Sequence, residues 1–135
     1  MVSKQFLSVK VRFGLLSVFF SFMYANCETS ERESLWSDLG YFYADSNPWI
    51  VGSDFNDILY VSEKYWSDYC QRKSRRDFSS FVSHTGLVDM GYIGDDFTLC
   101  NNPRGIHHMW CLLDRCFENI QAKYLFLNAS VHHMV

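Results

Sequence analysis

A carboxylate and a carboxamide follow an apolar stretch near the middle of the chain. Asp54 and Asn56 come after residues 49–53, which follow Pro48 and are typical of a buried strand. If the extended backbone continues, both side chains point to one side and Phe55 points to the other. Asp54 could then take a proton from water or contact a metal ion, and Asn56 could donate to a phosphate oxygen. A plain turn is the alternative, and these turn-forming residues alone favour it.

Length and composition indicate one globular domain over residues 1–135. The apolar fraction of 48% and aromatic fraction of 18% are enough for a hydrophobic core and exclude a disordered protein. The net charge of −3 gives no general attraction to nucleic acid, so any such binding must depend on a local patch. The five cysteines are odd in number and form no CxxC pair, which favours reduced thiols in an intracellular protein over a disulfide framework or zinc site.

The N-terminal residues allow two interpretations. Lys4, Lys10 and Arg12 precede an apolar run at residues 15–25, as in a secretory signal peptide, and the run is too short for a membrane span. Residues 8–13, however, alternate between polar and apolar side chains, which is typical of a half-buried strand. We favour a hairpin of two core strands, and therefore an intracellular location (nuclear or cytoplasmic) over secretion.

Two helices and several strands are predicted along the rest of the chain. A capping box at Ser30 and Glu33 starts a first helix that ends before Pro48. A second helix is expected at about residues 73–84, with Gly86 as its C-terminal cap. Strands are expected at residues 18–24, 49–51, 97–100 and 108–113, residues 57–69 should form a surface loop, and residues 117–126 are ambiguous. This order predicts an α/β layered domain.

A cluster of positive charge opens the second predicted helix. It comprises Arg72, Lys73, Arg75 and Arg76. Such a cluster could bind a phosphate backbone, but the sequence alone favours a solvated helix face.

Three short motifs occur in an order that resembles the endonuclease/exonuclease/phosphatase superfamily. They are residues 23–25 (Met-Tyr-Ala), 52–56 (Gly-Ser-Asp-Phe-Asn) and 113–115 (Leu-Asp-Arg). The sequence looks most like the endonuclease domain of plant LINE-type (non-LTR) retrotransposon polyproteins. Each motif is weak by itself, whereas their order and spacing are fairly specific. The spacer residues that also look like this group are Arg32, Leu35, Trp36, Leu39, Pro48, Trp49, Glu63, Lys64, Phe78, Phe81, 87–91, Phe97, Thr98 and 128–133.

The resemblance implies a four-layer α/β sandwich with a mixed sheet and packed helices. It also implies Mg²⁺-dependent phosphodiester hydrolysis, with DNA as the partner and no membrane. By the same resemblance, Tyr24 would contact the scissile phosphate, Asp54 would activate the attacking water, Asn56 would bind the phosphate and Asp114 would orient a catalytic histidine.

The sequence departs from the family pattern at several points. It contains no counterpart of the metal-binding glutamate or of the terminal Ser-Asp-His motif, and neither His132 nor His133 is expected to be catalytic. Ser53 replaces a usual glycine, and Leu99 replaces a usual tryptophan. We therefore expect a partial domain, truncated at both ends, that is inactive and has no metal ligands of its own.

Two other functions stay open. The chain could be an active Mg²⁺-dependent endonuclease or phosphoesterase that another chain completes. It could also be a secreted non-enzymatic protein, based on the signal-like N-terminus and the glycosylation sequon at Asn128-Ala129-Ser130.

Overall fold

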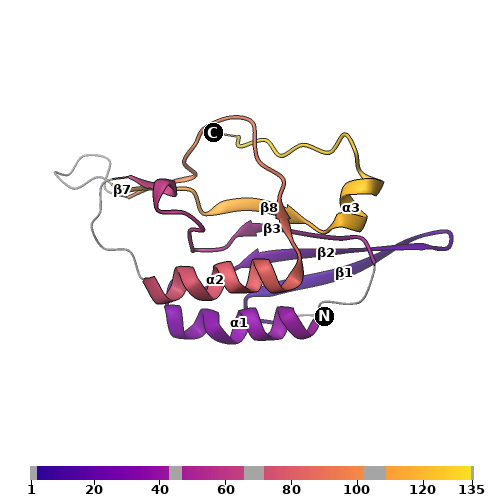
Figure 1. Ribbon diagram of the computed structural model, residues 1–135, viewed down its shortest axis with the longest axis horizontal. Coiled ribbons are helices and arrows are strands. Elements are labelled where there is room, and N and C mark those ends of the chain that lie inside the picture. Colours follow the sequence, from indigo (N-terminus) through magenta and orange to yellow (C-terminus); the bar gives the residue numbers. More distant parts are fainter. Residues whose placement is uncertain (1–2, 43–46, 66–71, 102–108, 135) are drawn as a thin grey trace.

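The protein has a mixed α/β fold in the computed structural model, which describes residues 3–42, 47–65, 72–101 and 109–134 (Figure 1). This confirms the predicted fold class. The helices are α1 (Thr29–Phe42), α2 (Arg72–Thr85) and α3 (Ile120–Leu125), with a short 3-10 helix at Val61–Glu63. The strands are β1 (Phe6–Phe13), β2 (Leu16–Tyr24), β3 (Trp49–Asp54), β4 (Lys64–Tyr65), β5 (Val88–Asp89), β6 (Leu99–Asn101), β7 (Met109–Cys111) and β8 (Asp114–Glu118).

The main sheet has five strands in the order β1-β2-β3-β8-β5. The predicted N-terminal hairpin is confirmed, because β1 and β2 pair antiparallel around a turn in which Gly14 has a φ of +60°. β3 pairs parallel with β2 and antiparallel with β8. β2 is therefore an interior strand, and the N-terminal apolar run is part of the sheet. The smaller sheet has the order β4-β7-β6.

Helices α1 and α2 lie side by side and bury their apolar faces against the main sheet (Figure 1). Trp36 of α1 stacks on Phe78 of α2, with 4.9 Å between the ring centroids, and Phe78 meets Phe117 of β8 edge-on. Burial of such aromatic and aliphatic side chains is the main force that holds the layers together. The buried core also includes Phe6, Met23, Ala25, Leu35, Leu39, Trp49, Val51, Phe55, Phe81 and Leu87.

The helix boundaries agree closely with the sequence patterns. α1 begins at Thr29, so the predicted capping residue Ser30 lies inside its first turn. α2 ends just before Gly86, whose φ of +66° is that of a C-terminal cap. None of the helices within the described ranges is long and apolar enough to cross a membrane.

The strand prediction for residues 108–113 is wrong in part. Met109–Cys111 is β7 of the smaller sheet, while β8 of the main sheet begins at Asp114, so one apolar run serves two sheets. The predicted loop at residues 57–69 contains the 3-10 helix and β4 in its described part. His108 and Cys70 lie outside the described residues.

One face of the β1–β2 hairpin is apolar and exposed. Leu7 pairs with Phe22, and Phe13 pairs with Leu16, on the face away from the buried Phe6 and Met23. Between 39% and 60% of the surface of these four side chains is accessible. The face would be buried if a further layer of chain packed on it.

Candidate functional site

Three of the predicted site residues lie in one row across neighbouring strands. Tyr24, at the end of β2, pairs with Asp54 at the end of β3, and Asp54 pairs with Asp114 at the start of β8. β2 and β3 are parallel, so their carboxyl ends meet, while the antiparallel β8 meets them with its first residue. Side chains at directly opposed positions are close enough to interact. The sheet therefore brings Tyr24, Asp54 and Asp114 together at one end.

Asn56 joins this row through a turn. Its backbone N–H donates to Oδ1 of Asp54 at 2.8 Å, and its φ of +46° lies in the left-handed region that asparagine tolerates. Phe55 between them is fully buried, although the backbone does not continue in the extended form that the alternation assumed. The residues thus form a turn, and this turn holds Asn56 beside Asp54.

The side-chain amide of Asn56 already has partners within the chain. It donates to the carbonyl oxygen of Ala25 and, at 3.4 Å, to Oδ2 of Asp54. These bonds fix the amide against the ends of β2 and β3. A phosphate oxygen would have to displace one of them to accept a hydrogen bond from the amide.

Burial raises the pKa of the Asp54 carboxyl above its ordinary value of 3.8. The hydrogen bond from the backbone of Asn56 lowers the pKa, the nearby charge of Asp114 raises it, and Arg32 lowers it again. Desolvation and the like-charged neighbour both disfavour the carboxylate form. A proton or a cation at this end of the sheet would relieve that cost.

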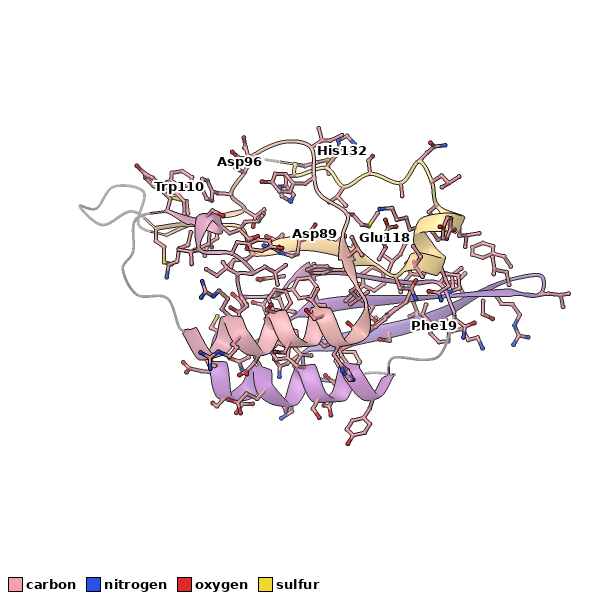
Figure 2. All side chains as sticks on the ribbon, viewed as in Figure 1. Phe19, Asp89, Asp96, Trp110, Glu118 and His132 are labelled. Carbon is pink, nitrogen blue, oxygen red and sulfur yellow. The ribbon has the colours of Figure 1, made fainter. Side chains whose placement is uncertain are left out.

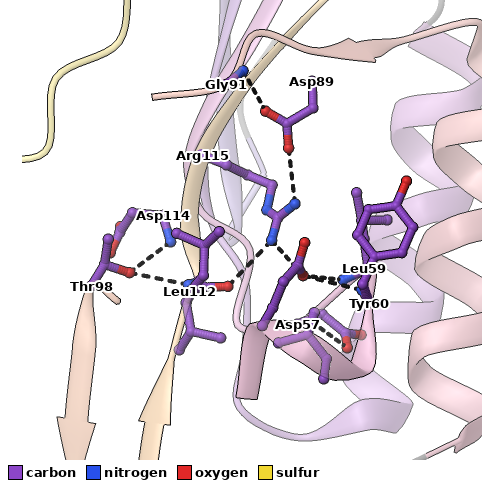
Figure 3. Close-up of polar contacts among 12 residues, drawn as sticks. Asp57, Leu59, Tyr60, Asp89, Gly91, Thr98, Leu112, Asp114 and Arg115 are labelled. Carbon is purple, nitrogen blue, oxygen red and sulfur yellow. Dashed lines mark hydrogen bonds and ion pairs between the residues drawn. The ribbon is translucent and has the colours of Figure 1, made fainter. Parts of the chain in front are cut away.

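Asp114 is positioned by its backbone. Oγ1 of Thr98 accepts hydrogen bonds from the N–H groups of Leu113 and Asp114, both at 3.0 Å (Figure 3). The carbonyl of Leu113 in turn accepts from the N–H of Phe55 at 3.1 Å. A single threonine hydroxyl therefore fixes the point at which β8 begins, next to Asp54.

Arg115 is a structural residue of the site that the sequence analysis left without a role. Its side chain is buried, and it donates to Glu63 at 2.7 Å and to Asp89 at 2.9 Å (Figure 3). Glu63 also accepts from the backbone N–H groups of Leu59 and Tyr60. Arg115 thus ties β8 and β5 to the loop that follows Asn56.

A second buried arginine holds the other side of this loop. Arg32 of α1 donates to the carbonyl oxygens of Asn26 and Cys27, both at 2.7 Å, and its Nε lies 3.5 Å from Asp57. Both members of the ion pair are buried. Arg115 belongs to the 113–115 motif and Arg32 to the spacer residues, but their carboxylate partners Asp57, Glu63 and Asp89 are far away in sequence. Sequence spacing therefore carried no signal of these contacts.

A polar cleft adjoins the site. It has a volume of about 460 Å³, and Tyr24 and Asn56 form part of its wall. Tyr24 is 73% exposed, so its hydroxyl is available to a ligand. The other lining residues are Ser3, Lys4, Gln5, Ala25, Asn26, Cys27, Glu31, Ser34 and Asp38.

The described residues fit a Mg²⁺ site only in part. Asp54 and Asp114 offer two carboxylates, but no group of three or more His, Cys, Asp or Glu side chains that could hold a metal ion occurs in the described ranges. Magnesium requires near-octahedral oxygen coordination, so two carboxylates would leave most positions to water and substrate. No step of the chemistry below is therefore assigned to a metal ion held by this chain.

His132 and His133 belong to a different part of the molecule. His133 stacks on Tyr92 and contacts the carbonyl oxygen of Asp95 at 2.8 Å, while His132 pairs with Ile93 in an isolated bridge. Figure 2 shows His132 and Asp96 on the side of the molecule opposite helices α1 and α2. Both histidines hold the C-terminal segment against residues 92–95.

Comparison with known proteins gives several similar solved structures. No family model matches the sequence, and no curated protein is significantly similar to it. The endonuclease domain of TRAS1, a telomere-specific non-LTR retrotransposon, is similar with a TM-score of 0.59 and 14% sequence identity, over 86% of this chain and 51% of that one. An endonuclease/exonuclease/phosphatase family protein from Leptotrichia buccalis C-1013-b gives a TM-score of 0.46 and 19% identity, over 86% of this chain and 41% of that one.

The likeness to the TRAS1 domain shows the fold. This chain has an endonuclease/exonuclease/phosphatase-type fold, as the order of its sequence motifs predicted. It spans about half the length of the TRAS1 domain.

Proposed function

We propose that this chain is one part of a metal-dependent phosphodiesterase domain of the retroelement endonuclease type, with nucleic acid as the substrate of the complete domain. The row of Tyr24, Asp54 and Asp114 across β2, β3 and β8 is the observation that carries this proposal. The motif order that resembles plant LINE-type endonucleases and the fold shared with the TRAS1 domain support it.

Each residue of the row has a chemical role in this proposal. Asp54 would take a proton from the attacking water, which its raised pKa favours. The exposed hydroxyl of Tyr24 and the amide of Asn56 would contact the scissile phosphate, and Asp114 would orient a histidine. A divalent cation bound in the complete domain would neutralise the charge that develops on the phosphate.

We further propose that the chain by itself does not cleave DNA. Two carboxylates would leave most of the coordination of Mg²⁺ to water and substrate, and the sequence supplies neither the expected glutamate nor the histidine that Asp114 would orient. Loss of one member of a catalytic unit typically lowers the rate by orders of magnitude.

A nicking assay tests this proposal. Purified protein is incubated with supercoiled plasmid and Mg²⁺ or Mn²⁺, beside an Asp54→Ala variant. We expect no nicking above background from either protein. Nicking that the Asp54→Ala substitution abolishes would refute inactivity, whereas equal nicking by both proteins would identify a contaminating nuclease.

The exposed face of the β1–β2 hairpin favours a second candidate function. A further polypeptide that covers Leu7, Phe13, Leu16 and Phe22 could also bring the missing catalytic groups, which would make this chain a subunit of an active endonuclease or phosphoesterase. Nicking that depends on Asp54 in the assay above would favour this candidate.

An intracellular location is also a proposal. It is supported by the place of residues 16–24 in the interior of the sheet, since a cleaved leader would remove a neighbour of β3. The secreted alternative depends on the sequon at Asn128, an exposed residue after α3. Expression with a fluorescent tag at the C-terminus would distinguish the two, because a nuclear or cytoplasmic signal contradicts secretion.

A further inference from the structure

A polar groove lies between α2 and the loop that follows the candidate site. It has a volume of about 600 Å³. Leu59, Tyr60 and Val61 form one wall, and Arg75, Arg76, Ser79, Ser80 and Ser83 of α2 form the other. None of these residues belongs to the row of Tyr24, Asp54 and Asp114.

The α2 wall is rich in hydrogen-bond donors. Arg75, Ser79 and Ser83 follow at helical spacing and share one face, with Arg76 and Ser80 beside them. The α2 wall carries two guanidinium groups and three hydroxyls, and among the residues that the structure describes no acidic side chain lines the groove. In the described part of the chain, neither Arg75 nor Arg76 forms an ion pair. Arginine stays charged at all physiological pH values and is well suited to phosphate oxygens.

The opposite wall offers an exposed aromatic ring. Tyr60 is 66% exposed, and its backbone N–H is held by Glu63, which Arg115 fixes in turn. The ring is therefore carried by an anchored loop. Aromatic rings at such positions stack on nucleic acid bases with little sequence preference.

We propose that this groove binds the backbone of a single nucleic acid strand, with a phosphate on Arg75 and Arg76 and a base on Tyr60. The loop starts directly after Asn56, so a strand in the groove can continue toward the row of Tyr24, Asp54 and Asp114. The solvated helix face expected from the sequence is thus a ligand site, because α2 faces a second wall. This inference rests on the proposed function only in that both assume a nucleic acid substrate.

Binding of a short fluorescent single-stranded DNA, followed by anisotropy, tests the proposal. The double variant Arg75→Gln/Arg76→Gln should bind at least about tenfold more weakly than the parent, and the slope of log K against log salt should fall by about 0.7, since the two arginines share one phosphate and each phosphate on a single strand contributes about 0.7. The double variant Lys10→Gln/Arg12→Gln also removes two positive charges, from the exposed part of β1, and should change neither value. An unchanged affinity and slope in the double variant would overturn the proposal.

A Tyr60→Ala variant separates a nucleic acid strand from a free anion. Loss of a stacked base should weaken DNA binding by roughly fivefold or more and leave the salt slope unchanged. Inorganic phosphate at moderate concentration should displace DNA only partly. If Tyr60→Ala binds DNA as the parent does while phosphate displaces it fully, the groove holds a free anion and the proposal is wrong. Thermal unfolding of each variant checks that the fold is intact.

Failure of this inference is distinguishable from failure of the proposed function. The nicking assay measures chemistry at the row of Tyr24, Asp54 and Asp114, whereas anisotropy measures binding at Arg75, Arg76 and Tyr60, and none of these three groove residues belongs to that row. Absence of DNA binding by the parent would overturn the groove proposal and leave the nicking result to decide the proposed function.

Discussion

Asp54 carries a cost in stability. Its pKa is raised above 3.8 in the folded chain, so the folded state binds the proton more tightly than the unfolded state does. The ionised carboxylate therefore lowers the free energy of unfolding at pH values above the folded pKa. Groups that are poised for catalysis often carry such a cost.

We expect Asp54→Asn to be more stable than the parent at neutral pH. The gain should be at most about 1 kcal/mol, because solvent reaches part of the side chain and screens its charge. The gain should shrink as the pH falls through the folded pKa toward 3.8, where the parent carboxyl is also neutral. Urea unfolding at neutral and acidic pH measures this difference, with the exposed Asp38→Asn as control. A variant less stable than the parent at neutral pH would contradict the burial argument.

Ser53 stores strain in the backbone next to Asp54. Its φ of +109° is a conformation that favours glycine, and the resemblance expects glycine at this position. Such a residue costs about 1–3 kcal/mol. Ser53→Gly should therefore raise the free energy of unfolding by about 1 kcal/mol, after the greater freedom of glycine in the unfolded chain is counted. In β2, where φ is ordinary, Ser17→Gly should lower the free energy of unfolding. If both substitutions lower the free energy of unfolding, Ser53 is not strained.

At the scale of elements, Arg115 decides how the loop after Asn56 is held. Arg115→Met should lower the free energy of unfolding by about 3–5 kcal/mol, because Glu63 would stay partly buried without its cation. Hydrogen exchange of the Leu59 and Tyr60 amides should also become faster, since both donate to Glu63.

A matched control is available in the same network. Asp89, the other partner of Arg115, has a side chain about 34% exposed, so Asp89→Asn should cost clearly less than Arg115→Met. Equal losses from both substitutions would contradict the view that burial of Glu63 dominates.

The sequence was sufficient to predict the helices and strands that have a clear local pattern of residues. Alternation at residues 8–13 predicted β1, and the capping box at Ser30 and Glu33 predicted the start of α1 to within one residue. It failed at residues 108–118, because a continuous apolar run does not show where one strand ends and the next begins. The break depends on Thr98, whose hydroxyl binds the backbone of Leu113 and Asp114 from a distant segment.

Only part of the candidate site could likewise be predicted from the sequence. The turn at Asp54 and Asn56 could be predicted, since it depends on the local preferences of turn-forming residues. The contacts of Arg32 and Arg115 could not, since a buried arginine in a strand or helix is recognised only by partners that the fold supplies.

At the scale of the whole molecule, the exposed face of the hairpin predicts self-association. We expect the isolated protein to associate at micromolar concentration and to bind a hydrophobic dye, because Leu7, Phe13, Leu16 and Phe22 are exposed apolar side chains on one face of the hairpin. Phe22→Ser should reduce both effects. Light scattering and dye fluorescence are the measurements.

The control for this prediction is Ile120→Ser on α3. Ile120 is 50% exposed, close to the 54% of Phe22, but lies outside the hairpin. It should leave association and dye binding nearly unchanged. If the parent protein stays monomeric and does not bind the dye, the exposed face of the hairpin does not drive association and the prediction is wrong.

The order of strands in the main sheet also has a consequence for folding. β1 and β2 are neighbours in sequence and can pair early, whereas β3 pairs with β8 across residues 50 to 118. Closing so long a loop is entropically costly and slow. Tyr24 and Asp54 can thus meet before Asp114 has joined them. During synthesis on the ribosome Asp114 emerges late, so the complete row of site residues should form only at the end of folding.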